Sequence, residues 1–288
     1  MNFLTDVFNN RELATFIWGL VLIVIFLINS KIRSSIAIVV KAFFQRNILL
    51  IFIFMILYTS LTILLLYNIN LWDFTLIKET IYWILGVALV LLVNINEASN
   101  DPDYFKNLSL KNFRIMIVIE LIVNLYTFSF IIEMIIIPII SFFVIFAVFS
   151  ESKREYLPVK KLTNFIIGIF GIVVLIYSII NLISDFQSVW TFDNLKAFLL
   201  PILLLIMYMP FLYLLTIYMV YELMFIRLDI VLNKDRAINR YAKKKILALC
   251  NINLMRLNKF VKENTHRLSR FKSKEEIQEI VNDFKKGN

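Results

Sequence analysis

The sequence predicts an all-α protein: a polytopic helical membrane protein with five to seven crossings and a short cytosolic basic helical domain. Hydrophobic residues make up 60% of the 288 residues and gather in runs long enough to cross a bilayer. Positive charge is concentrated near the end, where residues 227–272 hold thirteen Lys and Arg against three acids. These observations divide the chain into a transmembrane domain, residues 1–226, and a basic tail domain, residues 227–288.

The first predicted elements follow from caps and charge. Asn9 and Asn10 offer caps ahead of the apolar run 13–28, and no small-residue cleavage site follows this run, so we expect it to stay as a span. Residues 30–47 carry four bases and no acid among apolar side chains, which favours a helix along the cytoplasmic membrane surface. Further spans are predicted at 48–66, 78–93, 165–183 and 197–220.

Residues 115–149 form an almost unbroken apolar stretch that is too long for one crossing. As a single straight helix it would extend about 52 Å, against about 30 Å of hydrocarbon. One alternative is a tight hairpin of two spans that turns near Glu133 and Pro138. The other is a span followed by a broken or re-entrant segment whose backbone is covered by protein or faces a water-filled cavity. The crossing number depends on which alternative holds.

Charge in the connections predicts the orientation. Residues 151–161 carry four bases against two acids and are expected in the cytoplasm, whereas residues 184–196 carry two acids against one base and are expected outside. Residues 94–114 should also be cytoplasmic, so the central stretch would enter and leave on the same side. We therefore expect a multi-pass protein of the bacterial cytoplasmic membrane with its N-terminus outside and its tail inside.

Polar side chains at membrane depth are the first candidate site. Glu120, Asn124 and Thr127 are spaced to share one face of a helix, and Glu133 falls roughly opposite if that helix continues. Such groups suit a cation-favouring or proton-relaying pathway. The alternative is structural: hydrogen bonds to neighbouring helices for Asn124 and Thr127, and positions near the membrane surfaces for Glu120 and Glu133.

The basic tail is the second candidate site. An apolar pattern from Ile246 to Val261 predicts the buried face of a helix, and Ser273 with Glu276 predicts a capping box that opens another. Phosphates of anionic lipid or of a nucleic acid would suit the bases, although few aromatic residues are present for base stacking. The residues expected to bind a polyanion are Arg240, Lys243, Lys244, Lys245, Arg256, Lys259, Lys262, Arg267 and Arg270.

Motifs for catalysis are not found in the sequence. Cys250 is the only cysteine, so no disulfide forms within the chain, and His266 is the only histidine and lies in the basic tail. We find no metal-ligand cluster, phosphate-binding glycine loop or nucleophile elbow. We therefore expect a protein that is not an enzyme and that uses no cofactor or metal.

The layout, a multi-span core followed by a short basic helical tail that includes Arg240, Lys243–Lys245, Arg256 and Lys259, resembles the membrane effectors of prokaryotic anti-phage defence operons. Among these it is most similar to the channel subunit of the Hailong system. The resemblance implies a homo-oligomeric ion channel, a tetramer, in the inner membrane. It also implies a tail held by single-stranded DNA that a partner nucleotidyltransferase makes, and collapse of the membrane potential when the channel opens.

Three functions are therefore weighed. A ligand-gated ion channel is the leading hypothesis. A secondary transporter would usually show two similar halves with interrupted helices in corresponding positions, and only one unusual stretch, 115–149, is present. The third alternative is a non-conducting membrane anchor that recruits a partner through its tail.

Overall fold

The computed structural model describes residues 8–100, 104–105, 126–184, 191–232, 235–264 and 273–286. Every regular element in these ranges is helical, and six helices are long and apolar enough to cross a membrane. The all-α polytopic prediction is therefore confirmed. The six candidate spans are Asn10–Ile28, Arg46–Asn68, Phe74–Val93, Phe130–Phe149, Leu157–Ser184 and Asn194–Val231.

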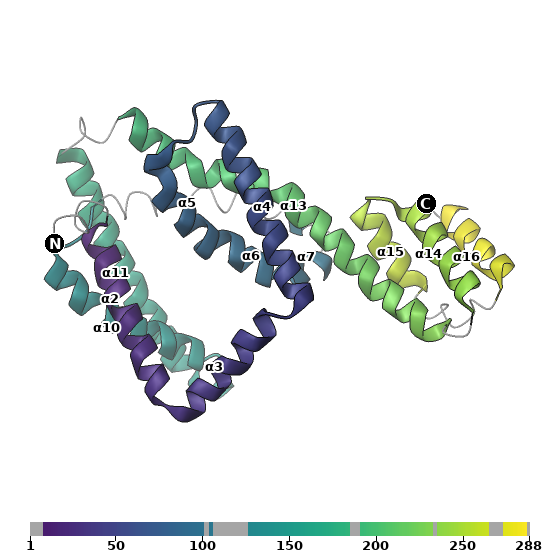
Figure 1. Ribbon diagram of the computed structural model, residues 1–288. Helices are drawn as coiled ribbons and strands as arrows, with labels where there is room; N and C mark the ends of the chain where they lie inside the picture. Colours follow the sequence, from purple (N-terminus) through teal and green to yellow (C-terminus); the bar gives the residue numbers. More distant parts are fainter. Residues whose placement is uncertain are drawn as a thin grey trace. The chain divides into compact units, whose positions relative to one another are not determined.

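Figure 1 shows the helices in their order along the chain. The first half of the chain contains α2 (Asn10–Ile28), α3 (Ser30–Phe43), α4 (Arg46–Asn68), η1 (Phe74–Leu76), α5 (Ile77–Trp83), η2 (Ile84–Ala88), α6 (Leu89–Val93) and α7 (Ile95–Asn100). The second half contains α10 (Phe130–Phe149), η3 (Arg154–Tyr156), α11 (Leu157–Ser184), α13 (Phe192–Val231), α14 (Arg236–Cys250), α15 (Leu254–Asn264) and α16 (Lys274–Lys286).

Two compact units make up the chain, and each is described by itself. The first consists of Met1–Ile56 with Ile115–Phe198, and the second of Leu57–Arg114 with Leu199–Asn288. The tail helices belong to the same unit as most of α13. The division into domains at residue 226 stays a prediction.

In the first unit, α2 begins as the caps predict. The Asn9 side chain accepts a hydrogen bond from the Glu12 N–H, and the Glu12 carboxylate accepts one from the Asn9 N–H, both at 2.8 Å, which forms a capping box. α3 follows after Asn29 and coincides with most of the predicted surface helix. None of its residues is buried, so both its basic and its apolar side chains are open to a membrane surface.

The break in the central stretch lies earlier than predicted. Residues 126–129 are not helical, and α10 then runs unbroken from Phe130 through Pro138. Pro138 has no N–H and leaves the carbonyl of Met134 without its helical partner. The indole of Trp18 in α2 donates to that carbonyl at 2.9 Å. Because this bond replaces the missing one, the helix does not turn at Glu133 or Pro138 as the hairpin alternative proposed.

In the second unit, the third span changes its helical type three times. It starts as a 3₁₀ turn, continues as α5, widens to a π-helix at Ile84–Ala88 and ends as α6. A π-turn inserts one extra residue per turn and is often found at functional positions. The span ends at Val93, as predicted.

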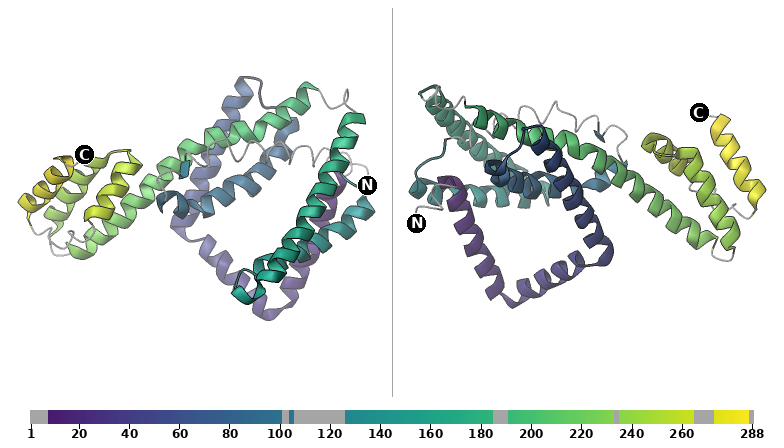
Figure 2. Two further views of the ribbon diagram at one scale, coloured as in Figure 1. Left: turned by 180° about the vertical axis from the view of Figure 1, so that it is seen from behind. Right: turned by 45° about the horizontal axis from the view of Figure 1, so that its top comes forward.

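α13 is far longer than a crossing requires. Its 40 residues extend about 60 Å, twice the hydrocarbon thickness. Its C-terminal half packs against the tail: Ile217, Met224 and Leu228 share one apolar core with residues of α14, α15 and α16. Figures 1 and 2 show these three helices gathered beside that end of α13. α13 therefore serves both as a candidate span and as the support of the tail, and the predicted span 197–220 lies within the candidate span Asn194–Val231.

The tail contains two helices where the apolar pattern predicted one. Ile246, Cys250, Leu254 and Leu257 are buried as expected, but the chain turns at Asn251–Asn253 between α14 and α15. Asn251 has a positive φ of 47°, which asparagine tolerates better than most residues. Asn253 then accepts a hydrogen bond from the Arg256 N–H at 3.0 Å and caps α15. The predicted capping box of Ser273 and Glu276 is confirmed at the start of α16.

Candidate functional site

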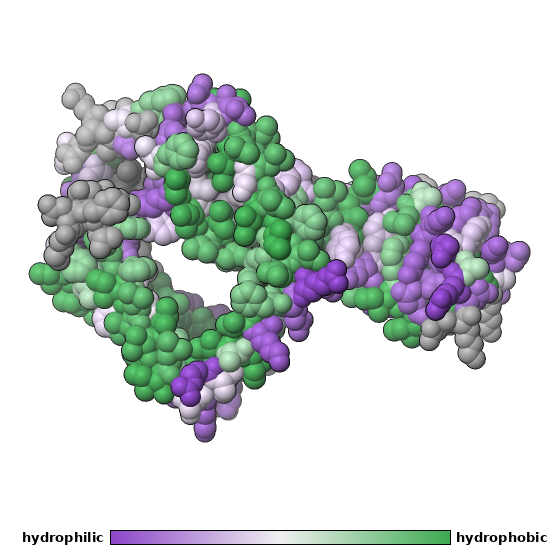
Figure 3. Space-filling model, viewed as in Figure 1, coloured by the Kyte–Doolittle hydropathy of each residue, from purple (hydrophilic) through white to green (hydrophobic). Residues whose placement is uncertain are grey.

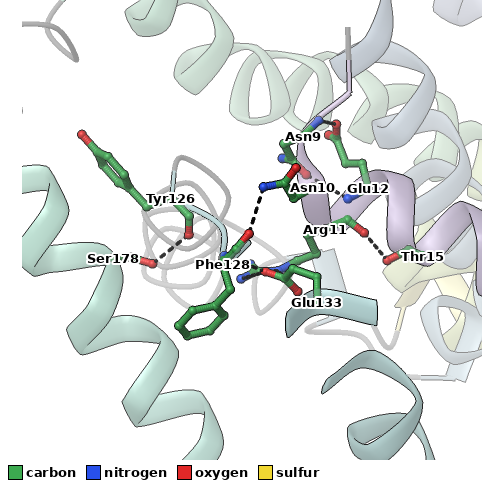
Figure 4. Close-up of polar contacts among 9 residues, drawn as sticks. All are labelled: Asn9, Asn10, Arg11, Glu12, Thr15, Tyr126, Phe128, Glu133 and Ser178. Carbon is green, nitrogen blue, oxygen red and sulfur yellow. Dashed lines mark hydrogen bonds and ion pairs between the residues drawn. The ribbon is translucent and has the colours of Figure 1, made fainter. Parts of the chain in front are cut away.

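Glu133 is held by an ion pair at the start of α10 (Figure 4). An Arg11 Nη atom lies 3.0 Å from one carboxylate oxygen, and Arg11 Nε donates to both oxygens at 3.2 and 3.3 Å. The same carboxylate accepts the N–H of Phe128 at 3.0 Å. Only 2% of the Glu133 side chain is exposed, against 20% for Arg11. Through this ion pair the carboxylate joins α2 to α10, and the positive charge of Arg11 balances its negative charge.

The segment just before α10 is fixed by side chains from two other helices. The Asn10 amide donates to the Phe128 carbonyl at 3.0 Å, and the Ser178 hydroxyl of α11 donates to the Tyr126 carbonyl at 3.4 Å. The rings of Phe128 and Tyr177 stack with centroids 4.4 Å apart. These bonds satisfy backbone groups that have no helical partner, which explains how a non-helical segment persists beside apolar helices.

Thr127, the last member of the predicted polar stripe, does not lie on a helix. Thr127 lies in the non-helical segment 126–129, so the helical spacing does not extend to it. The carbonyls of Tyr126 and Phe128 bond to side chains there instead. Glu120 and Asn124 lie outside the residues that the structure describes. Their roles stay predictions.

Glu133 also lies in the first turn of α10, at one end of a candidate span. α2 and α10 run in the same direction, since their first turns meet at Arg11 and Glu133 and each begins within three residues of this pair. With a rise of about 1.5 Å per residue, Glu133 is roughly 5 Å into α10. This position matches the structural alternative for this residue.

A polar and aromatic cluster in the second unit was missed by sequence reasoning. Tyr208 of α13 is 1% exposed, and its hydroxyl reaches the Ala88 carbonyl in the π-helix at 3.4 Å. The rings of Trp83 and Tyr208 meet edge to face at 5.4 Å, and the indole N–H of Trp83 is buried without a hydrogen-bond partner. Tyr58 of α4 donates to the Met207 carbonyl at 2.8 Å, beside the turn that Pro210 weakens. The sequence signal was the pair of prolines among tyrosines in α13.

The turn between α14 and α15 is bonded to α13 by two tyrosines. The Tyr213 hydroxyl donates to the Ile252 carbonyl at 2.8 Å and accepts the Leu254 N–H at 3.2 Å. The Tyr221 hydroxyl donates to the Asn251 carbonyl at 2.8 Å. These two tyrosines fix the tail to the last span.

The predicted polyanion-binding residues do not form one surface with one role. Lys243 pairs with Asp229 of α13 at 2.6 Å and lies over the Phe225 ring, so it joins α14 to α13. Lys245 lies over the Tyr241 ring at 5.4 Å. Exposed bases remain at Arg240, Lys244, Lys259 and Lys262. Arg267 and Arg270 lie outside the described residues.

Arg256 and Lys259 are brought together by the structure. With Asn253 and Met255 they line a shallow hollow of about 320 Å³ at the start of α15. Arg256 is partly buried, and its Nε is enclosed without a hydrogen-bond partner. No carboxylate is among the four lining residues.

The tail aromatics offer little for base stacking. Phe260 is fully buried against Phe284, with ring centroids 5.1 Å apart. Tyr241 is approached by both Lys245 and Lys274, and its hydroxyl donates to Gln278 at 3.1 Å. Any nucleic acid bound to these helices would therefore be held mainly by its phosphates.

Comparison with known proteins gave no match: no family model, no curated protein and no solved structure is similar to this chain. Function is therefore argued from the chain's own residues.

Proposed function

We propose that this chain is a ligand-gated ion channel of the bacterial cytoplasmic membrane, with a basic cytosolic tail that binds a polyanion. The observation that carries the proposal is the continuity of α13. One unbroken helix contacts the polar cluster at Tyr208 within the membrane part and, further along, the tail at Tyr213 and Tyr221. A force on the tail therefore reaches the membrane part through one continuous helix.

Irregular helices in the membrane part would let it respond to a force from the tail. α13 contains Pro201 and Pro210, each of which removes one helical hydrogen bond, and it packs beside the π-helix of the third span. Helices of this kind change conformation more readily than regular ones, because some of their backbone bonds are already absent or shifted. The buried, unbonded indole N–H of Trp83 lies at the same place.

The proposed orientation follows from charge. The Lys and Arg bias of the connections supports a cytoplasmic tail and an N-terminus outside. The number of crossings stays a prediction of five to seven.

The ion pathway is proposed to lie between copies of the chain. Beyond Tyr213, α13 exposes an apolar stripe on the face opposite the tail, with members four or eight residues apart: Leu214, Tyr218, Ile226 and Ile230, each 49–73% exposed. Outside lipid such a stripe is unfavourable unless it is covered. A second copy of the same helix covers it most simply, which agrees with the homo-oligomer, a tetramer, that the resemblance implies.

The proposed ligand of the tail is single-stranded nucleic acid, held by phosphates, as the resemblance implies. A nucleotidyltransferase encoded in the same operon would supply it. The exposed bases Arg240, Lys244 and Lys262 support this assignment through their charge. Opening would dissipate the membrane potential and act as antiviral defence.

Current through a planar bilayer that contains the purified protein tests the proposal. A channel passes discrete currents, a secondary transporter gives slow, saturable flux, and a non-conducting anchor gives neither. Subunit contact is tested in the same membranes by cross-linking Ile226→Cys, with Lys262→Cys as an exposed control outside the stripe. We expect cross-linked oligomers only from Ile226→Cys. Absence of current across a range of voltages, with and without an oligonucleotide, would leave the anchor as the better account.

A further inference from the structure

The length of α13 indicates that the turn between α14 and α15 lies near the membrane surface. Tyr213 and Tyr221 bond it to α13, and the 22 residues from 192 to 213 extend about 33 Å, close to the hydrocarbon thickness. A ring contact supports the same position of the turn without using the length of α13. The third span ends at Val93 and is followed by Asn94, and the ring of Phe105, twelve residues after Val93, meets the Tyr213 ring edge to face with centroids 5.4 Å apart.

Apolar side chains project from this turn without protein cover. Ile252 is 63% exposed and Met255 is 65% exposed. On the face that Figure 3 shows, the tail is mostly hydrophilic. Segments that insert at the boundary between headgroups and acyl chains typically combine apolar residues with neighbouring Lys and Arg.

The hollow beside these side chains has the chemistry of a phosphate site. Arg256 and Lys259 supply two positive charges, and Asn253 adds an amide. Arg256 carries a guanidinium, the group that binds phosphate through paired hydrogen bonds. The site does not depend on the α15 N-terminus, because the N–H groups of Leu254 and Arg256 already bond to Tyr213 and Asn253.

We propose that this hollow binds the phosphate of an anionic phospholipid, with Ile252 and Met255 resting among the acyl chains. A lipid offers both halves of this arrangement, a phosphate and hydrocarbon, whereas a nucleic acid offers no hydrocarbon and finds no free aromatic ring beside the hollow. This lipid site is separate from the proposed nucleic-acid site. It consists of one hollow near the membrane, whereas the nucleic acid would bind the bases on the other tail surfaces. A bound lipid would hold the tail at the membrane surface.

Lipid binding by the full-length protein in detergent, followed by native mass spectrometry, tests the site. Phosphatidylglycerol is the probe and phosphatidylcholine the reference. Replacing Arg256 and Lys259 together by Gln should weaken phosphatidylglycerol binding about thirtyfold, or about fivefold per base. The matched control, Arg240→Gln with Lys244→Gln, removes the same charge outside the hollow and should leave binding near that of the original protein. Continued protection of Cys250 from thiol reagents would show that each variant is folded.

The position of the turn has its own test. A fluorophore on Ile252→Cys in phosphatidylglycerol nanodiscs should be quenched by nitroxide-labelled lipid, whereas one on Glu279→Cys in α16 should not. Equal phosphatidylglycerol binding by the two double variants overturns the proposal, as does equal quenching at both positions. Loss of oligothymidylate binding, and not of lipid binding, in the Arg256 and Lys259 variant would reassign the hollow to nucleic acid. None of these measurements uses conductance, so they stand apart from the test of channel function.

Discussion

The start of α10 and the C-terminal half of α13 are both fastened by polar side chains, but by different means. At α10 a buried ion pair, Arg11 with Glu133, joins two span ends. At α13 two neutral tyrosine hydroxyls bond to the backbone of a turn, above an extensive apolar core. The first arrangement is strong and specific, and the loss of one partner is costly. The second consists of weak bonds on a separately packed surface, which suits an attachment that responds to a ligand.

The largest expected effect comes from breaking the ion pair on one side only. Glu133→Ala leaves Arg11 without its carboxylate in a poorly solvated place, and we expect a loss of about 3–5 kcal/mol in unfolding free energy. The measurement is thermal or denaturant unfolding in detergent. Replacing both residues by Met and Leu should recover most of this loss, because no charge is then left unpaired. A single variant as stable as the original protein would show that the pair contributes little.

Removal of an apolar side chain from the tail core sharpens the contrast. Leu257 is fully buried, and Leu257→Ala should destabilise the tail by about 3 kcal/mol through lost contacts and a cavity. We expect this loss to appear as faster labelling of Cys250, which is 1% exposed. Met255→Ala, at a site 65% exposed, is the control and should not change the labelling rate. Equal effects of the two substitutions would contradict the packing described for the tail.

Cys250 also makes tail stability depend on pH. Burial raises the pKa of its thiol from 9.0 to about 11, although Arg256 nearby acts in the opposite direction. Because the folded state holds this proton more tightly than the unfolded state, stability is fully present below about pH 9 and falls as pH rises toward 11. Denaturant unfolding at pH 8 and pH 10.5 should show the decline in the original protein and less of it in Cys250→Ala. An identical decline in both would assign it to other groups.

The smallest expected effect concerns the bond that replaces the one lost at Pro138. Trp18→Phe removes the indole donor to the Met134 carbonyl and should cost about 1 kcal/mol. In a Pro138→Ala background the helix supplies its own N–H, and the same substitution should cost less. A double-mutant cycle in detergent measures this difference. A coupling energy of zero would mean that the two features are unrelated.

The sequence was sufficient wherever periodicity and caps decide the structure. Long apolar runs identified the spans, and the pairs Asn9 with Glu12 and Ser273 with Glu276 marked two helix starts correctly. The break before α10 was misplaced because a proline in an apolar run suggests a turn. Only the Trp18 side chain, 120 positions from Pro138, shows how the helix continues through it.

The candidate sites were less predictable, because they depend on contacts between distant segments. Lys243 has the same local appearance as Lys244, yet its pairing with Asp229 removes it from the exposed bases. The split at Asn251 brought Arg256 and Lys259 into one hollow, and the length of α13 placed that hollow by Tyr213. Glu133 drew attention as an acid in an apolar run, but its partner Arg11 lies 122 residues away.

The central claim is that the tail acts on the membrane part through its attachment to α13, and a variant that lacks the hydrogen bonds of that attachment tests it most directly. Replacing Tyr213 and Tyr221 together by Phe removes only the two hydroxyls and keeps both rings. Single-channel recording in planar bilayers, with and without an oligothymidylate on the tail side, measures the change in open probability. We predict that the variant still conducts and still binds the oligonucleotide, while its open probability no longer responds to it. An undiminished response would contradict the claim.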